Sequence, residues 1–394
     1  MHRRQFLKSL GVTAPSFAGG QLFAAGVNQP RFLLVFLRGG YDAANLLVPV
    51  SSSYYYQSRP SIAIPRPAND LASALPLTSD WGLHPALRDS VLPLFKAGEA
   101  AFIPFAGTDD TSRSHFETQD SIELGQSSGQ RKNYQSGFLN RLSAVLGNGD
   151  SMAFTDQLPL IFQGSTPIPN TALRTISKPS VDARQSSIIS AMYGGTKLAS
   201  SVVEGFTVRD DVVQELATEM DAANRNAITA KGFELEARRI ARLMKDHYSL
   251  GFVDVGGWDT HVGQGGVNGY LASRFDELGR GLSSFAREMG TQWRNTTVVV
   301  ISEFGRTFKQ NGSGGTDHGH GSVYWVLGGS VRGGRVAGEQ VAVEQANLFQ
   351  NRDFPVLNDY REILAGLFSR QYALTATQSD KVFAGVKPKD LGLL

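Results

Sequence analysis

The sequence predicts an α/β fold in which a mostly parallel sheet is flanked by helices. Two observations support this prediction. Short apolar runs, several of them followed by glycine, recur along the chain, and segments with helical periodicity lie between them. We find no internal repeat and no long low-complexity linker. The simplest organisation is a signal peptide at residues 1–26 followed by a single domain at residues 27–394.

The expected strands are continuous apolar runs, which are typical of strands buried on both faces of a parallel sheet. Phe32–Leu37 is followed by the tight turn Arg38-Gly39-Gly40, and Thr296–Ile301 has the strongest strand pattern. The other three expected strands are Ala100–Phe105, Leu250–Val255 and Ser322–Leu327.

Helices are predicted where apolar side chains recur at three- and four-residue spacing. This spacing marks residues 271–289 and 233–247, and Asn358 is expected to cap a helix that runs from Asp359 towards Phe368. Residues from about 125 to 205 are richer in Ser, Gly, Gln and Pro. We expect an excursion at about residues 125–230 that forms an inserted cap or rim segment over the sheet.

The N-terminus has the pattern of a twin-arginine export signal. Arg3-Arg4 is followed by Phe6-Leu7-Lys8 and by a mild apolar stretch, Leu10–Ala25, that is too short and too weak to span a membrane. His2 stands where the usual pattern has Ser or Thr. We expect a folded protein that passes through the twin-arginine translocase and is periplasmic or secreted.

Composition excludes several classes of protein. The chain has no cysteine, so it has no disulfide, thiolate metal site or cysteine nucleophile. The formal net charge is +2, and loss of the three basic residues of the signal leaves a mature chain near −1. A nearly neutral chain argues against a nucleic-acid partner. No later apolar run approaches about 18 residues, so we expect no stable membrane insertion.

Histidines and carboxylates gather where ligands bind in an open parallel sheet, beyond the carboxyl ends of the strands. Asp259 and His261 would point the same way in an extended segment, and so would His318 and His320. Without cysteine, such groups are how a protein holds one or two divalent ions, such as zinc or manganese. The alternative for Asp259 and His261 is a turn aspartate and a surface histidine, and the alternative for His318 and His320 is a flexible solvent loop. The candidate metal ligands are Asp42, Asp259, His261, Glu303, Asp317, His318 and His320.

Two serines and three arginines are candidates for catalysis. Ser112 and Ser114 precede a predicted helix over residues 116–124, where either is a nucleophile beside an anion-binding helix end or a plain cap. The neighbouring His115 is a ligand, a base or a packed residue. An arginine after a strand could clamp phosphate or sulfate, or pair with Asp42 or Glu303. These arginines are Arg38, Arg113 and Arg306.

Four motifs in order resemble the bacterial domain-of-unknown-function 1501 family, over residues 31 to about 370. Its members typically carry a twin-arginine signal, and the family is more distantly similar to the alkaline phosphatase and sulfatase superfamily. The resemblance therefore implies an alkaline phosphatase-like fold. The motifs are Leu37-Arg38-Gly39-Gly40-Tyr41-Asp42, Ser112-Arg113-Ser114-His115-Phe116, Gly257-Trp258-Asp259-Thr260-His261 and Ser302-Glu303-Phe304-Gly305-Arg306-Thr307.

By position, this resemblance implies roles for particular residues. Asp42 is similar to the Asp of one metal site, Ser112 or Ser114 to the nucleophile, and Asp259 with His261 to ligands of the other metal. His318 or His320 is similar to a final His ligand. Glu303 and Phe304 depart from an Asp-His pair. The second metal site is then short of a ligand, unless His115 or the second loop histidine supplies it.

The sequence thus favours an exported metal-dependent hydrolase of phosphate or sulfate esters. The expected partner is a small anionic ester or a sulfated or phosphorylated glycan. A one-metal site, an altered site and an inactive enzyme are all compatible with the departures. The alternative is a non-catalytic secreted protein that keeps the fold and binds a metal ion or a carbohydrate.

Overall fold

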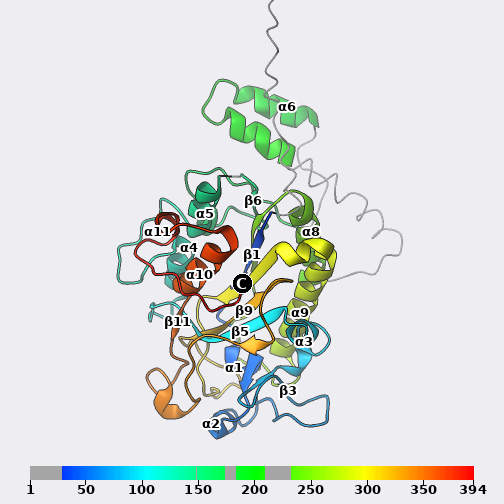
Figure 1. Cartoon of the computed structure of the whole chain (residues 1–394), viewed down its shortest axis with the longest axis vertical. Coiled ribbons are helices and arrows are strands. Elements are labelled where there is room, and N and C mark those ends of the chain that lie inside the picture. Colours follow the sequence, from blue (N-terminus) through cyan, green and yellow to red (C-terminus); the bar gives the residue numbers. More distant parts are fainter. Residues whose placement is uncertain (1–28, 148, 174–182, 209–231) are drawn as a thin grey trace, which may run out of the picture.

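The computed structural model describes residues 29–147, 149–173, 183–208 and 232–394 (Figure 1). The predicted signal peptide lies outside the described residues. Within them, no helix combines the length and apolar character that a membrane crossing requires.

The centre of the fold is an eight-stranded sheet with the order β10-β5-β9-β8-β1-β7-β6, in which β11 also pairs with β5. The five strands predicted from the sequence are all present, which confirms an α/β fold with a mostly parallel sheet. The bounds are β1 (Arg31–Leu37), β5 (Ala100–Gly107), β6 (Ser151–Ala153), β7 (Leu250–Val255), β8 (Thr296–Ser302), β9 (Ser322–Leu327), β10 (Arg335–Val336) and β11 (Asn358–Asp359).

Strand β9 runs against its two neighbours, whereas the other described pairs in this sheet are parallel. The amino end of β9 therefore lies at the same edge as the carboxyl ends of β1, β5, β7 and β8. The connection from β8 to β9 leaves and re-enters the sheet at this edge. For this reason residues before β9 join those that follow the other strands.

Helices cover both faces of the sheet (Figure 1). The alternate side chains of β1 enter two separate cores: Leu33, Val35 and Leu37 in one, and Phe32, Leu34 and Phe36 in the other. Full burial of each such side chain contributes about 1.5–3 kcal/mol. Helices α3 (Val91–Lys96), α8 (Phe233–Asp246) and α9 (Tyr270–Met289) pack on the first face. The second face is covered by α4 (His115–Leu124), α5 (Phe138–Leu146), α10 (Tyr360–Tyr372) and α11 (Ala376–Val382).

The helices predicted over residues 233–247 and 271–289 are confirmed as α8 and α9. The predicted cap at Asn358 is wrong by one residue, because Asp359 accepts from the backbone N–H of Arg361 and α10 begins at Tyr360. Asn358 instead lies in β11, where its side-chain amide donates to the backbone carbonyls of Pro104 and Glu339. Because Asn358 and Asp359 pair with β5, the helix begins one residue later than the sequence predicts.

Two further regions complete the described structure. A small antiparallel sheet, β2 (Leu47–Pro49), β3 (Leu75–Pro76) and β4 (Trp81–Leu83), lies with α1 (Ala43–Leu46) and α2 (Ser53–Ser58). Within the expected excursion, β6 joins the edge of the main sheet, so part of this segment extends the sheet. Helix α6 (Ala183–Met192) lies beyond the sheet, at the top of Figure 1.

Candidate metal centre

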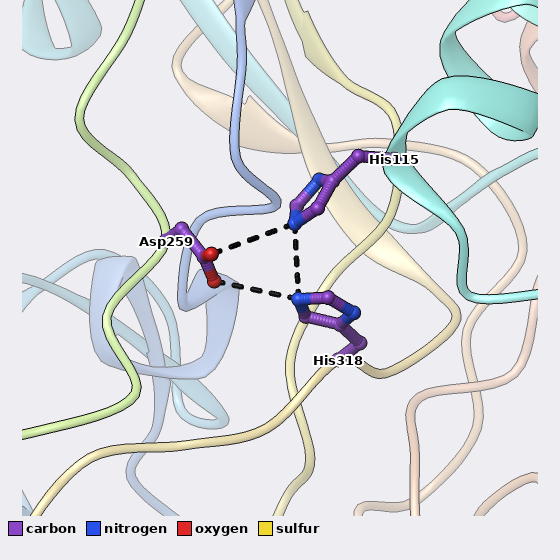
Figure 2. A group of neighbouring side chains, drawn as sticks. All are labelled: His115, Asp259 and His318. Atoms are coloured by element: carbon purple, nitrogen blue, oxygen red, sulfur yellow. Dashed lines mark hydrogen bonds and ion pairs between the residues drawn. The ribbon is translucent and has the colours of Figure 1, made fainter.

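Side chains from three loops meet at the shared edge of the sheet. His115 is the first residue of α4, after β5; Asp259 follows β7; His318 lies in the connection between β8 and β9. Figure 2 shows their ligand atoms directed towards one another. The Nε2 atom of His115 lies 2.9 Å from Nε2 of His318 and 3.6 Å from Oδ2 of Asp259. The Nε2 atom of His318 lies 3.4 Å from Oδ1 of Asp259.

His261 adds a fourth group to this cluster. Its Nε2 atom lies 3.1 Å from Nε2 of His318 and 3.0 Å from Oδ1 of Asp259. Ligand atoms around a tetrahedral zinc ion are about 3.3 Å apart, given zinc–nitrogen bonds of about 2.0–2.1 Å. The separations among His115, Asp259 and His318 therefore suit one small divalent ion, and His261 lies beside this group. The side chains of His261 and Asp259 are 41% and 45% exposed, so the cluster is open to solvent.

The outward nitrogens of the three imidazoles all have partners. His115 Nδ1 lies 2.8 Å from Oε1 of Glu303, and His261 Nδ1 lies 3.1 Å from Oδ1 of Asp317. His318 Nδ1 lies 3.0 Å from the backbone carbonyl of Arg113. A carboxylate or carbonyl that fixes the second nitrogen is the usual companion of a metal-bound histidine.

These partners decide where the protons lie. Ionised carboxylates and carbonyls only accept hydrogen bonds, so each neutral ring carries its proton on Nδ1 and a lone pair on Nε2. The lone pairs then face one another with no donor between them, which is unfavourable unless a cation is present. Burial and the neighbouring His115 lower the pKa of His318, which opposes relief by protonation. The two imidazole nitrogens of His115 and His318 and the carboxylate of Asp259, with His261 beside them, therefore fit a divalent metal ion.

Glu303 is buried directly after β8 and contacts the cluster through His115. Its Oε1 accepts from the backbone N–H of Gly39 and from Gln119, each at 2.8 Å, in addition to His115. Its Oε2 accepts from Ser302 at 2.9 Å. Burial alone would raise the pKa of Glu303, but the hydrogen bonds from His115, Gln119 and the backbone outweigh it and lower the pKa. The side chain is thus a fixed anion.

Asp259 is held in place by Arg306, whose guanidinium donates to its Oδ1. Burial opposes ionisation of Asp259, but this hydrogen bond and the positive charge outweigh it and lower the pKa. Gly39 permits the close approach of the two loops. It has φ +123°, and a Cβ at this position would lie only 2.7 Å from the backbone nitrogen of Asp259.

The structure places two expected ligands outside this cluster. Asp42 is buried in an ion pair with Arg59, and it also accepts from Gln264 at 2.6 Å. The ring of His320 packs on Phe349 with centroids 4.6 Å apart. Burial and the nearby Arg113 lower the pKa of His320. Asp317 contacts one histidine of the cluster, His261, through its Nδ1 atom.

The candidate catalytic side chains are engaged in local structure. Ser114 caps α4, and its Oγ accepts from the backbone N–H of Glu117. Ser112 Oγ lies 3.5 Å from Thr118 Oγ1 and accepts from the backbone N–H of Ser114. Arg113 donates to Asp353 at 2.8 Å.

Arg38 donates to Asp254 at 2.6 Å and to Glu123 at 2.9 Å. All three candidate arginines, Arg38, Arg113 and Arg306, therefore form ion pairs with carboxylates of the protein.

Sequence reasoning missed Gln119 and Asp353. Gln119 lies four residues after His115 in α4, and residues at this spacing share a helix face. That spacing could have identified it as a second partner of Glu303. Nothing in the sequence pairs Asp353 with Arg113, because 240 residues separate them.

The family model described as "Protein of unknown function (DUF1501)" matches residues 29–386. The chain belongs to this family. No curated protein matches the sequence. The resemblance to this family is confirmed, and the family is described as one of unknown function.

Several solved structures are similar to the DUF1501 chain. One is a protein in the alkaline phosphatase superfamily from Vibrio parahaemolyticus, with 13% identity, 88% and 68% coverage of this chain and that one, and TM-score 0.40. Ps i-CgsB in complex with k-i-k-neocarrahexaose has 9% identity, 92% and 75% coverage, and TM-score 0.39. The C-terminal periplasmic domain of EcEptC from Escherichia coli, in complex with Zn, has 9% identity, 78% and 75% coverage, and TM-score 0.35. At these identities and TM-scores the similarities carry no inference about activity.

Proposed function

We propose that this protein is a metal-dependent hydrolase of phosphate or sulfate esters, with its centre at His115, Asp259, His261 and His318. One observation carries the proposal. The Nε2 atoms of three imidazoles lie close to one another or to the carboxylate of Asp259, and a carboxylate or carbonyl oxygen accepts at the Nδ1 atom of each ring. Zinc is the preferred ion because imidazole-rich sites favour it, and manganese is the second choice.

A bound ion would supply a Lewis acid and would lower the pKa of a bound water or hydroxyl. The protein's own residues perform the remaining tasks. Glu303 and Asp317 orient two of the imidazoles, and Arg306 holds Asp259. Ser112 and Ser114 remain the candidate nucleophiles, because they directly precede the cluster residue His115 in the sequence.

The proposal includes export by the twin-arginine translocase to the periplasm or the exterior. It rests on Arg3-Arg4 and the apolar stretch after them. The proposed substrates are small anionic esters or sulfated or phosphorylated glycans. Their anionic group would bind at the solvent-exposed side of the cluster, where Asp259 and His261 are accessible.

One observation favours a non-catalytic metal- or carbohydrate-binding protein as the second candidate. Three arginines that could clamp an ester anion are already paired with protein carboxylates. A hydrolase would then depend on the metal ion for most of its attraction to the anion. These arginines are Arg38, Arg113 and Arg306.

Metal content and ester hydrolysis together test the proposal. The full chain, purified without chelators, is analysed by mass spectrometry and assayed with p-nitrophenyl phosphate and p-nitrophenyl sulfate. His318→Ala removes the nitrogen that contacts both other imidazoles. His247→Ala is the matched control, because His247 ends α8 just before β7, at the opposite edge of the sheet.

We expect the wild type and His247→Ala to retain metal, and His318→Ala to lose it together with hydrolysis. Retention of metal without turnover of either ester would favour the non-catalytic candidate. A wild-type protein that binds neither zinc nor manganese would contradict both candidates that use the metal centre.

A further inference from the structure

Arg306 lies inside the candidate centre and is surrounded by oxygen atoms. Its side chain has no exposed surface, and it enters from the β8–β9 connection, three residues after Glu303. The guanidinium donates to Asp259 Oδ1 and to four backbone carbonyls. These carbonyls belong to Gly39, Gly40, Trp258 and Thr316.

The five acceptors come from three separate parts of the chain. Gly39 and Gly40 follow β1, Trp258 and Asp259 follow β7, and Thr316 precedes His318 by two residues. A single atom, Arg306 Nη2, donates to two of these carbonyls, that of Gly39 at 2.8 Å and that of Trp258 at 3.3 Å. A planar guanidinium with several fixed donors can join such groups, whereas a lysine ammonium offers only a compact charge.

Carbonyl and carboxylate oxygens around a small volume are also what a hard divalent cation requires. Here the guanidinium fills that volume and satisfies the oxygens. It supplies a positive charge next to Asp259, which also faces the imidazoles of His115 and His318. One carboxylate therefore lies between a fixed organic cation and the place for a metal ion.

We propose that Arg306 is a positioning residue that serves as a built-in second cation: it fixes Asp259 towards the imidazoles and occupies the oxygen-lined space beside it, so that the centre binds a single metal ion. This inference rests on the proposed metal centre and specifies its stoichiometry. It replaces the expectation that Arg306 clamps the substrate.

Arg59 provides a matched control. It is also a fully buried arginine, and it pairs with Asp42 and donates to the backbone carbonyls of Phe308 and Thr307. In the described part of the chain its hydrogen bonds go to Asp42, Asn45, Phe308 and Thr307, and none reaches a side chain of the centre. Arg59→Lys thus reports the loss of stability caused by replacing a buried guanidinium. Arg306→Lys reports the same loss together with any change in metal binding.

The experiment measures Mn²⁺ and Co²⁺ binding to the full chain. We expect one ion per wild-type chain, about tenfold to a hundredfold weaker binding in Arg306→Lys, and unchanged affinity in Arg59→Lys, because changes behind a ligand cost about this much. The Co²⁺ absorption spectrum should change in Arg306→Lys alone. Arg306→Ala, which empties the space, should bind a second Mn²⁺, visible as spin coupling by electron paramagnetic resonance.

The outcomes separate the two proposals. Wild-type stoichiometry of two would overturn the role of Arg306, and so would wild-type affinity and spectrum in Arg306→Lys. A wild type that binds no ion would overturn the metal centre and this inference together. If Arg306→Ala does not fold, the two lysine variants still decide between positioning and a merely structural role.

Discussion

The buried His84 and the solvent-exposed histidine cluster differ in what their ring nitrogens contact. His84, which caps a short helix at Pro85–Leu87, accepts from the backbone N–H of Ala86 and lies 3.1 Å from the Gly266 carbonyl. One nitrogen accepts and the other donates, so a neutral His84 is satisfied by the protein alone. In the cluster every outward nitrogen faces an acceptor, and three lone pairs converge. The nature of the outer partner, more than the presence of histidine, distinguishes a metal centre from a packed ring.

Metal removal should give the largest difference between the two environments. We expect zinc at a thousand times its dissociation constant to raise the free energy of unfolding by about 4 kcal/mol, because it binds the folded state only. Urea unfolding with and without a chelator measures this effect. His318→Ala should unfold at the same urea concentration in both conditions. An equal chelator effect in that variant would place the stabilising ion elsewhere.

The His84 environment should respond to pH instead. Burial lowers the pKa of His84 to about 4, against a hydrogen bond with Gly266 that raises it. Since the unfolded chain takes up the proton first, stability should fall as the pH drops from about 6.5 to about 4, by roughly 3 kcal/mol in total. His84→Gln should flatten this part of the stability curve. An unchanged slope in His84→Gln, measured by urea unfolding at several pH values, would contradict the assignment.

Replacing an outer partner of the cluster should have a smaller effect. Glu303→Gln keeps the shape of the side chain but removes the charge that faces His115, and we expect zinc affinity to fall about tenfold to a hundredfold. Competition with a chromogenic chelator measures the affinity. Glu339→Gln, at the surface ion pair with Lys389, serves as the control and should bind zinc like the wild type.

The smallest effect is expected at His320. His320→Gln should leave zinc affinity unchanged and lower the free energy of unfolding by about 1 kcal/mol, as is usual for loss of a packed side chain. Chelator competition and urea unfolding on one preparation measure both quantities. A hundredfold loss of zinc affinity would instead restore His320 as a ligand.

Much of the fold could be predicted because its strands are continuous apolar runs. Phe32–Leu37 and Thr296–Ile301 are buried on both faces of the sheet, and this burial requires apolar residues at every position. The edge of the sheet that carries the candidate site was also predictable, because ligand-bearing residues follow those runs. The antiparallel direction of β9 was not, since the pattern of a buried strand has no direction.

The choice between neighbouring histidines depended on contacts that the sequence does not reveal. An extended segment would have placed His318 and His320 on one side. Instead, Gly319 packs against the backbone of Arg306, where a Cβ would lie 2.4 Å from a carbonyl carbon, and the two rings enter different surroundings. Asp42 was expected as a ligand, but its partner Arg59 is identified only by the fold.

The spacing of the candidate ligands along the chain bears on how the protein folds. His115 and His318 are 203 residues apart, and the loops that carry the whole cluster meet only after β5, β9, β8, β1 and β7 have joined one sheet. Closing such long loops is slow, and no short peptide of this chain contains the complete donor set. An ion can therefore be captured only by a chain whose sheet is already assembled. We expect refolding rates to be independent of zinc, with the ion slowing unfolding instead.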